Sequence, residues 1–287
     1  MTGGDHRHTC HVDWSARVNV AAQATEGKTM NPHILVTGGT GTIGRHVVPL
    51  LRAAGHPVRV LSRRGGRSGD GVTHVTADLL SGADLGPALR GVRTVLHLAG
   101  GAKGDDRAAA HLVRAARRAA VTHLVHISVT GADRVPLAWM RSKLDAERAV
   151  ADSGVLWTVL RAAQAHDLAL TMLTAMTRLP VAPVPGGLRL QPVDAAEVAA
   201  RLAELTLGAP AGLVPDLAGP HTYGIGELLT GYLAATGKRR ARLPVRIPGR
   251  AGRAYREGAN LARPGAARGV RTWADFLADR VPSRPVA

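Results

Sequence analysis

The sequence predicts an α/β protein that combines a doubly wound parallel sheet with a smaller C-terminal lobe. From residue 33 onward, short β-branched runs alternate with stretches of helical periodicity, which is typical of βαβ units. A glycine-rich turn separates the first run from the first helical stretch. After residue 165 the alternation weakens and prolines gather, which indicates the start of the smaller lobe.

Six runs are short and β-branched enough to be predicted as strands. They are His33–Thr37, Val58–Ser62, Val72–Thr76, Thr94–Leu98, Leu124–Ser128 and Trp157–Leu160. The first helix has an apolar face from Ile43 to Ala54, with Pro49 inside it and Gly55 as its C-cap. Further helices are predicted at Asp105–Ala120, Leu137–Ser153, Ala195–Leu207, Gly226–Thr236 and Thr272–Asp279. The Arg-, Gly- and Pro-rich run over residues 239–271 is predicted to be mostly irregular surface.

These patterns divide the chain into three parts. Residues 1–30 are polar and lack hydrophobic periodicity, so we expect a flexible N-terminal extension. Residues 31–165 form the parallel-sheet domain, and residues 166–287 form the smaller lobe packed on it. The extension holds four residues of metal-binding type, His6, His8, Cys10 and His11. It has no core to fix their geometry, so we predict no metal site. Met30, just before the first strand, is a hypothetical alternative start of translation.

Composition limits the classes of function. A single cysteine, Cys10, leaves no internal disulfide, so we expect a cytoplasmic protein. No run reaches the roughly 18 apolar residues that a membrane span needs, and we expect no membrane partner. The formal net charge is +16, but only four of the 37 basic residues are lysines and the arginines are spread along the chain. Because no nucleic-acid recognition motif accompanies this charge, we rank nucleic-acid binding last among the functions considered.

The glycine-rich turn is the strongest motif in the chain. Gly38 permits a tight turn, Gly41 lets the backbone approach a pyrophosphate, and Gly44 permits close packing of helix on strand. The N-terminus of the following helix supplies oriented N–H groups for phosphate. A Rossmann-type dinucleotide site is therefore predicted at Gly38, Gly39, Thr40, Gly41, Thr42, Ile43 and Gly44.

The spacing Gly38-x-x-Gly41-x-x-Gly44 resembles that of extended and atypical short-chain dehydrogenases/reductases. In that family, an acidic residue at the end of the second strand implies NAD(H). Here the strand runs into Arg63 and Arg64, whose guanidinium groups would favour a 2′-phosphate, so NADP(H) is preferred over NAD(H). Two solvated arginines in an arginine-rich chain are the alternative.

The same resemblance implies the rest of the cofactor site. It places Asp78 and Leu79, after the third strand, beside the adenine. It places Ala99 and Gly100, at the end of the fourth strand, beside the cofactor ribose. These assignments follow from the family pattern and not from the residue chemistry alone.

The family's catalytic pattern is present only in part. Ser128 occupies the position of the catalytic serine, and Lys143 that of the lysine in the Tyr-x-x-x-Lys pair. Trp139 stands where the tyrosine should be, and an indole N–H does not act as an acid at physiological pH. Lys143 would still contact the nicotinamide ribose, unless it forms an ordinary helical ion pair with Glu147.

The segments 127–133, 143–148, 157–161 and 163–167 resemble the NmrA-like branch of the family. This branch includes NADPH-dependent quinone reductases that lack the tyrosine, and proteins that bind the dinucleotide as redox sensors. We therefore predict a reductase that passes hydride to a quinone-like or conjugated small-molecule acceptor. His166 would orient a substrate oxygen, or else it is a packed or solvated histidine. The alternative function is a catalytically silent NADP(H) sensor, and a homodimer is left open.

Overall fold

The structure is a computed structural model that describes residues 33–281, apart from residues 83 and 102. The predicted N-terminal extension, with its four histidine and cysteine residues, lies outside the described residues. Within the described part, no helix is long and apolar enough to cross a membrane.

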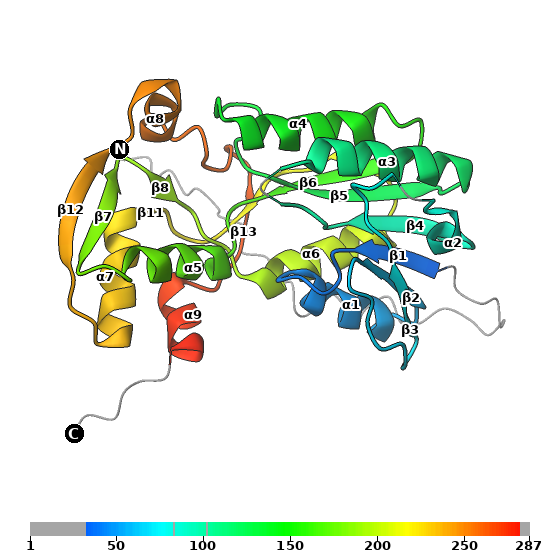
Figure 1. Cartoon of the computed structure of the whole chain (residues 1–287), viewed down its shortest axis with the longest axis horizontal. Helices are drawn as coiled ribbons and strands as arrows, with labels where there is room; N and C mark the ends of the chain where they lie inside the picture. Colours follow the sequence, from blue (N-terminus) through cyan, green and yellow to red (C-terminus); the bar gives the residue numbers. More distant parts are fainter. Residues whose placement is uncertain (1–32, 83, 102, 282–287) are drawn as a thin grey trace, which may run out of the picture.

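A nine-stranded parallel sheet forms the larger part of the molecule (Figure 1). Its order is β13-β10-β6-β5-β4-β1-β2-β3, and β9 pairs with β6. All strands of this sheet are parallel, but the order in which they are added reverses between β1 and β4, which is characteristic of a doubly wound sheet. The predicted fold class is therefore confirmed. The strands are β1 (His33–Thr37), β2 (Val58–Ser62), β3 (Val72–Thr76), β4 (Val92–His97), β5 (His123–Val129), β6 (Leu156–Ala162), β9 (Gly212–Leu213), β10 (Leu217–Ala218) and β13 (Ala267–Arg268).

Helices cover both faces of this sheet, because alternate residues of each strand point to opposite faces. One core contains Val36 together with residues of α1 (Gly44–Ala53) and α6 (Ala195–Leu207). The other contains Leu35 together with residues of α2 (Gly86–Leu89), α3 (Asp105–Arg118) and α4 (Ala138–Ala151). Figure 1 shows α3 and α4 on one side of the sheet and α1 and α6 on the other.

The smaller lobe lies beside the sheet, on the left in Figure 1, and has its own apolar core. Tyr232, Trp273 and Phe276 belong to this core. Its helices are α5 (His166–Met176), α7 (Ile225–Thr236), α8 (Gly249–Arg256) and α9 (Trp273–Arg280). Its strands are β7 (Val181–Gly186), β8 (Arg189–Leu190), β11 (Tyr223–Gly224) and β12 (Ala241–Arg246).

The chain passes more than once between the two parts. After residue 166 it returns to the large sheet through α6, β9, β10 and β13. Residues of α6 thus pack in the core of the large sheet, and the division of the chain at residues 165/166 remains a prediction. The prediction of irregular structure over residues 239–271 was wrong in part, because β12 and α8 form there. β12 contains Pro244, which sequence reasoning treats as a breaker, but only β7 pairs with it among the described strands.

His166 packs in the lobe as an aromatic side chain. Its ring is fully buried, with its centroid 5.1 Å from that of Phe276 and 5.9 Å from that of Trp273. Neither ring nitrogen has a hydrogen-bond partner among the described residues. Burial lowers the pKa of His166 to about 4, so the ring is neutral at physiological pH.

A buried ion network ties α4 to β6. The Arg161 guanidinium donates to both carboxylate oxygens of Glu147, at 2.7–3.2 Å, and lies 3.0 Å from a carboxylate oxygen of Asp133. Burial alone would lower the pKa of Arg161, but the two carboxylates outweigh it and raise that pKa. The predicted alternative of a Lys143–Glu147 pair is therefore wrong, since Glu147 is committed to Arg161.

Removing Glu147 leaves much of the charge on Arg161 buried without its bidentate partner. We expect Glu147→Ala to lower the free energy of unfolding by about 3 kcal/mol in urea titrations. The matched control is Asp145→Ala on the same helix, whose pair with Arg148 is exposed and whose loss costs less than about 1 kcal/mol. Equal losses in the two variants would contradict this account of the network.

The buried His166 makes the fold sensitive to acid. Its pKa is about 4 in the folded chain and 6.5 when unfolded, so between these pH values only the unfolded chain takes up the proton. Stability therefore falls as pH drops from 6.5 to 4, by on the order of 2–3 kcal/mol from this residue. We expect His166→Leu to remove that part of the pH dependence in urea titrations, whereas His221→Leu, at an exposed histidine, leaves it unchanged. Identical pH profiles for His166→Leu and the parent protein would refute the assignment.

Candidate functional site

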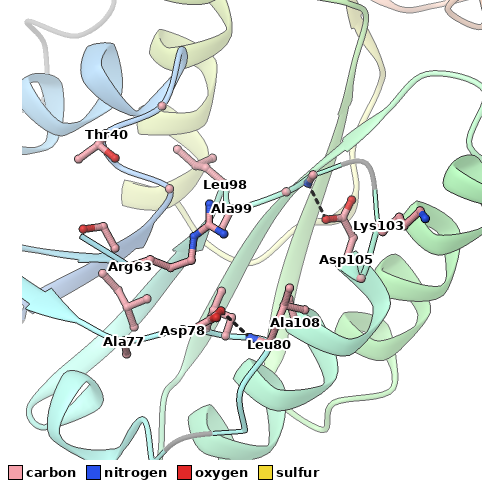
Figure 2. Close-up of a pocket in the computed structure, with 18 residues that line it drawn as sticks. Thr40, Arg63, Ala77, Asp78, Leu80, Leu98, Ala99, Lys103, Asp105 and Ala108 are labelled. Atoms are coloured by element: carbon pink, nitrogen blue, oxygen red, sulfur yellow. Dashed lines mark hydrogen bonds between the residues drawn. The ribbon is translucent and has the colours of Figure 1, made fainter. Parts of the chain in front are cut away.

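A cavity of about 340 Å³ lies at the carboxyl ends of four neighbouring strands. Its lining comes from Gly38, Thr40 and Gly41 after β1, from residues 61–63 at the end of β2, from residues 77–80 after β3, and from residues 98–101 after β4. The N-terminus of α3 closes another side with Asp105. Figure 2 shows this lining. The cavity lies where the strand order reverses, which is where open α/β sheets bind ligands.

The glycine turn brings backbone segments together as the sequence predicted. Gly38 has a positive φ of 71°, and a Cβ there would lie 2.7 Å from the Ala99 nitrogen. A Cβ on Gly44 would lie 2.3 Å from the Gly38 oxygen, so only glycine lets α1 start this close to β1. The Gly41 N–H donates to the Gly38 carbonyl at 2.9 Å.

The start of α1 is suited to an anion. Ile43 is its N-cap residue and gives no side-chain hydrogen bond to the first turn, so the helix begins without a side-chain acceptor. Gly41 lines the cavity. A Cβ on Gly41 would approach only the carbonyl oxygen of Gly38, at 3.2 Å, so its other sides are open. These features fit a pyrophosphate on the turn. Gly39, Thr42, Ile43 and Gly44 shape the turn without lining the cavity.

The two predicted arginines differ in position. Arg63 lines the cavity, and Figure 2 shows its side chain reaching inward from the end of β2. Arg64 is exposed and is not among the lining residues. Asp78 and Leu79 both line the cavity. The Asp78 carboxylate accepts from the Leu80 N–H at 2.9 Å, which fixes the turn after β3.

Lys143 reaches the cavity edge from α4 through an ion pair. Its Nζ lies 2.7 Å from a carboxylate oxygen of Asp105, and the other oxygen accepts from the Gly101 N–H at 2.8 Å. A Cβ on Gly100 would lie 2.6 Å from the same Nζ, so the ammonium group sits directly against that backbone. Asp105 therefore fixes both the loop after β4 and the position of Lys143. Sequence reasoning missed this role, and its one signal is an acidic residue opening the helix that follows the Gly100 turn.

Buried polar groups lie on the neighbouring strands, on the sheet face covered by α3 and α4. The His97 ring bonds to the Thr37 hydroxyl at 2.7 Å through Nδ1 and stacks on His126 at 5.0 Å. Burial lowers the pKa of His97 to about 4, with a smaller effect of Lys143 in the same direction. Ser128, two residues after His126, is buried, and its hydroxyl has no hydrogen-bond partner among the described residues. It does not line the cavity.

The structure thus brings together part of the predicted site. Gly38, Thr40, Gly41, Arg63, Asp78, Leu79, Ala99 and Gly100 line one cavity. Lys143 is held at its edge, whereas His166 is buried in the lobe against α9 and does not line the cavity. Among the residues that the structure describes, no three His, Cys, Asp or Glu side chains form a group that could hold a metal ion.

Known proteins resemble part of this chain. A reductase of (4-alkanoyl-5-oxo-2,5-dihydrofuran-3-yl)methyl phosphate from Streptomyces griseus is 41% identical over 135 residues, which are 45% of this chain and 46% of the relative. Quinone oxidoreductase 2 of Escherichia coli is 29% identical over 136 residues, 45% of this chain and 47% of the relative. These alignments span about half the length of either curated relative.

The fold has close counterparts among solved structures. The NADPH complex of the NADPH-dependent quinone oxidoreductase from E. coli superposes with a TM-score of 0.71 at 20% identity, covering 86% of this chain and 99% of that one. At this identity the likeness shows the fold. The family model described as NAD(P)H-binding matches residues 38–205, more than half of the chain, from the glycine turn into α6. The chain therefore belongs to the NAD(P)H-binding family.

Proposed function

We propose that the protein is an NADPH-dependent reductase that passes hydride to a quinone-like or other conjugated acceptor. The observation that carries this proposal is the cavity at the strand ends, which unites the glycine turn, Arg63 and the Lys143–Asp105 pair. The names of the relatives support the substrate class, since they include a quinone oxidoreductase and another reductase. Membership in the NmrA-like branch, a cytoplasmic location and a homodimer are further parts of the proposal.

The preference for NADP(H) rests on Arg63. A guanidinium group pairs with a phosphate through charge-assisted hydrogen bonds, and no carboxylate in the described structure lies within 4.0 Å of this one. We assign the 2′-phosphate to Arg63, the pyrophosphate to the turn at Gly41, and the adenine to the surface beside Asp78 and Leu79.

The reaction needs little proton chemistry from the protein. When bound, the dinucleotide supplies a hydride from its nicotinamide, and a quinone that accepts it takes its proton from solvent. Trp139 offers no acid for carbonyl reduction, and His97 and His126 are buried as neutral rings. Lys143 supplies a fixed positive charge at the cavity edge, which orients the ribose and stabilises charge that develops on the acceptor.

A second candidate function follows from the same geometry. The chain lacks the tyrosine acid, and the Lys143 ammonium is already paired with Asp105. These features suit a protein that binds NADP(H) and reports its redox state to a protein partner without turnover. The two functions share the cavity and differ only in what NADPH does there.

Substituting the two arginines separately tests the cofactor assignment. We expect Arg63→Ala to raise the Kd for NADPH about 10- to 100-fold in calorimetric titrations, because hydrogen bonds to a charged group contribute roughly 1.5–3 kcal/mol. NADH binding should stay unchanged, and Arg64→Ala, which alters an exposed neighbour, should change neither Kd more than about twofold. If Arg63→Ala weakened NADPH and NADH equally, the 2′-phosphate assignment would be wrong.

Turnover distinguishes the reductase from the sensor. We expect the protein to oxidise NADPH with at least one member of a panel of small water-soluble quinones, followed by absorbance of the reduced nicotinamide. Lys143→Met should lower kcat/KM by about tenfold or more, the loss expected when an oriented charge is removed, while NADPH still binds. Lys238→Met, which removes a lysine that contacts Tyr232 in the lobe, is the control. Tight NADPH binding without oxidation by any quinone would favour the sensor.

A further inference from the structure

The small sheet of β7 and β12 has an outer face made only of apolar residues. The strands are parallel, with Val181 paired to Ala241, Pro183 to Leu243 and Pro185 to Val245. Their alternate residues Ala182 and Val184 pack inward in the lobe core. The outer face therefore consists of Val181, Pro183, Pro185, Ala241, Leu243 and Val245, and we refer to it as the β12 face.

Large side chains on and beside the β12 face are open to solvent. Leu243 is 54% exposed and Val181 43% exposed, and Leu179, just before β7, is 64% exposed. Figure 1 shows β12 at the outer margin of the lobe, at the opposite end of the molecule from β3. An apolar cluster of this kind usually marks a surface that contacts another partner.

The same segment holds half of the protein's excess charge. Residues 238–256 contain one lysine, seven arginines and no acidic residue, a formal charge of +8 out of +16 for the whole chain. Arg242 and Arg246 alternate with the apolar residues of β12, so they lie on the opposite face of this small sheet, and both are exposed. Arg239 and Arg250, just before and just after β12, are exposed as well. Within the described residues, none of these eight cations has a carboxylate within 4.0 Å, whereas Arg45, Arg148 and Arg161 elsewhere do.

The positive charge of residues 238–256 limits which partners can bind the β12 face. A second copy would bring another +8 against it, which opposes a symmetric dimer through this face. Residues 1–32 carry three acidic and three basic residues, so they offer no compensating charge. Single-stranded nucleic acid is bound by stacking on aromatic side chains, and the β12 face has none.

We propose that the β12 face binds the surface of an anionic lipid bilayer. The exposed Leu243, Val181 and Leu179 would enter the boundary between headgroups and acyl chains, and exposed arginines that flank β12, such as Arg239 and Arg250, would pair with lipid phosphates. Exposed apolar side chains close to cations are the combination that holds interfacial proteins to such membranes. This peripheral contact revises the sequence-based expectation of no membrane partner, without any membrane span.

The contact goes beyond the proposed reductase activity and does not depend on it. The cavity opens at the ends of β1–β4, in the sheet domain, whereas the β12 face lies in the smaller lobe. Membrane binding is therefore measured without cofactor or acceptor, and its failure would leave the reductase proposal intact.

Flotation of the full chain with lipid vesicles tests the proposal. We expect association with vesicles of phosphatidylcholine and phosphatidylglycerol, at least about tenfold weaker association with phosphatidylcholine alone, and release as salt rises. Arg239→Glu/Arg250→Glu should lower association about tenfold or more, and Leu243→Asp should also lower it. The matched control is Arg93→Glu/Arg114→Glu, which makes the same change in charge at exposed positions of β4 and α3. Far-UV circular dichroism and thermal unfolding of each variant show whether it is folded.

Three results would overturn the proposal. The first is equal association with neutral and anionic vesicles. The second is an equal loss of association in Arg239→Glu/Arg250→Glu and in its control, which would mean that only the net charge matters. The third is binding of a DNA duplex or formation of a dimer that depends on Leu243, together with no vesicle binding.

Discussion

The structure depends on a close approach of backbone between β1, α1 and the loop after β4. Gly38 and Gly44 occupy the two points where a single Cβ would collide with main-chain atoms, at 2.7 and 2.3 Å. Because nothing but hydrogen fits there, α1 starts directly behind the sheet edge and its N-terminus faces the cavity. The shape of the cavity at this end, and the position of the helix N-terminus beside it, follow from these contacts.

The ion pair of Lys143 with Asp105 extends this arrangement to the other side of the cavity. Asp105 joins three elements, because it opens α3, holds the Gly101 N–H and pairs with a lysine on α4. The result is a cavity lined by Arg63 at the end of β2 and by Lys103 just before α3, with the Lys143–Asp105 ion pair at its edge (Figure 2). Such a distribution of cations suits a long cofactor that carries both a pyrophosphate and a 2′-phosphate.

Local patterns predicted the large sheet and half of the site. β1, β2, β3 and α6 have the bounds expected from their periodicity, and the glycine motif located the cavity. Prediction from the sequence failed at features that depend on contacts between residues far apart in the chain. Asp105 and Lys143 are 38 positions apart, and only the packing of α3 on α4 brings them together. β12 was not predicted because its proline and arginines interrupt the apolar pattern of a strand, and because it pairs only with β7 among the described strands. His166 follows β6 and was therefore predicted to orient a substrate oxygen, yet aromatic residues of α9, more than a hundred positions later, enclose it.

The central claim is that the turn at Gly41 binds the pyrophosphate of a dinucleotide. Calorimetric titration of NADPH into the parent protein and into Gly41→Asp tests it directly, since the new carboxylate would stand against the phosphates. Gly69→Asp, at an exposed glycine with open space around it, is the matched control. The account predicts that only Gly41→Asp loses binding, and equal binding by the two variants would contradict it.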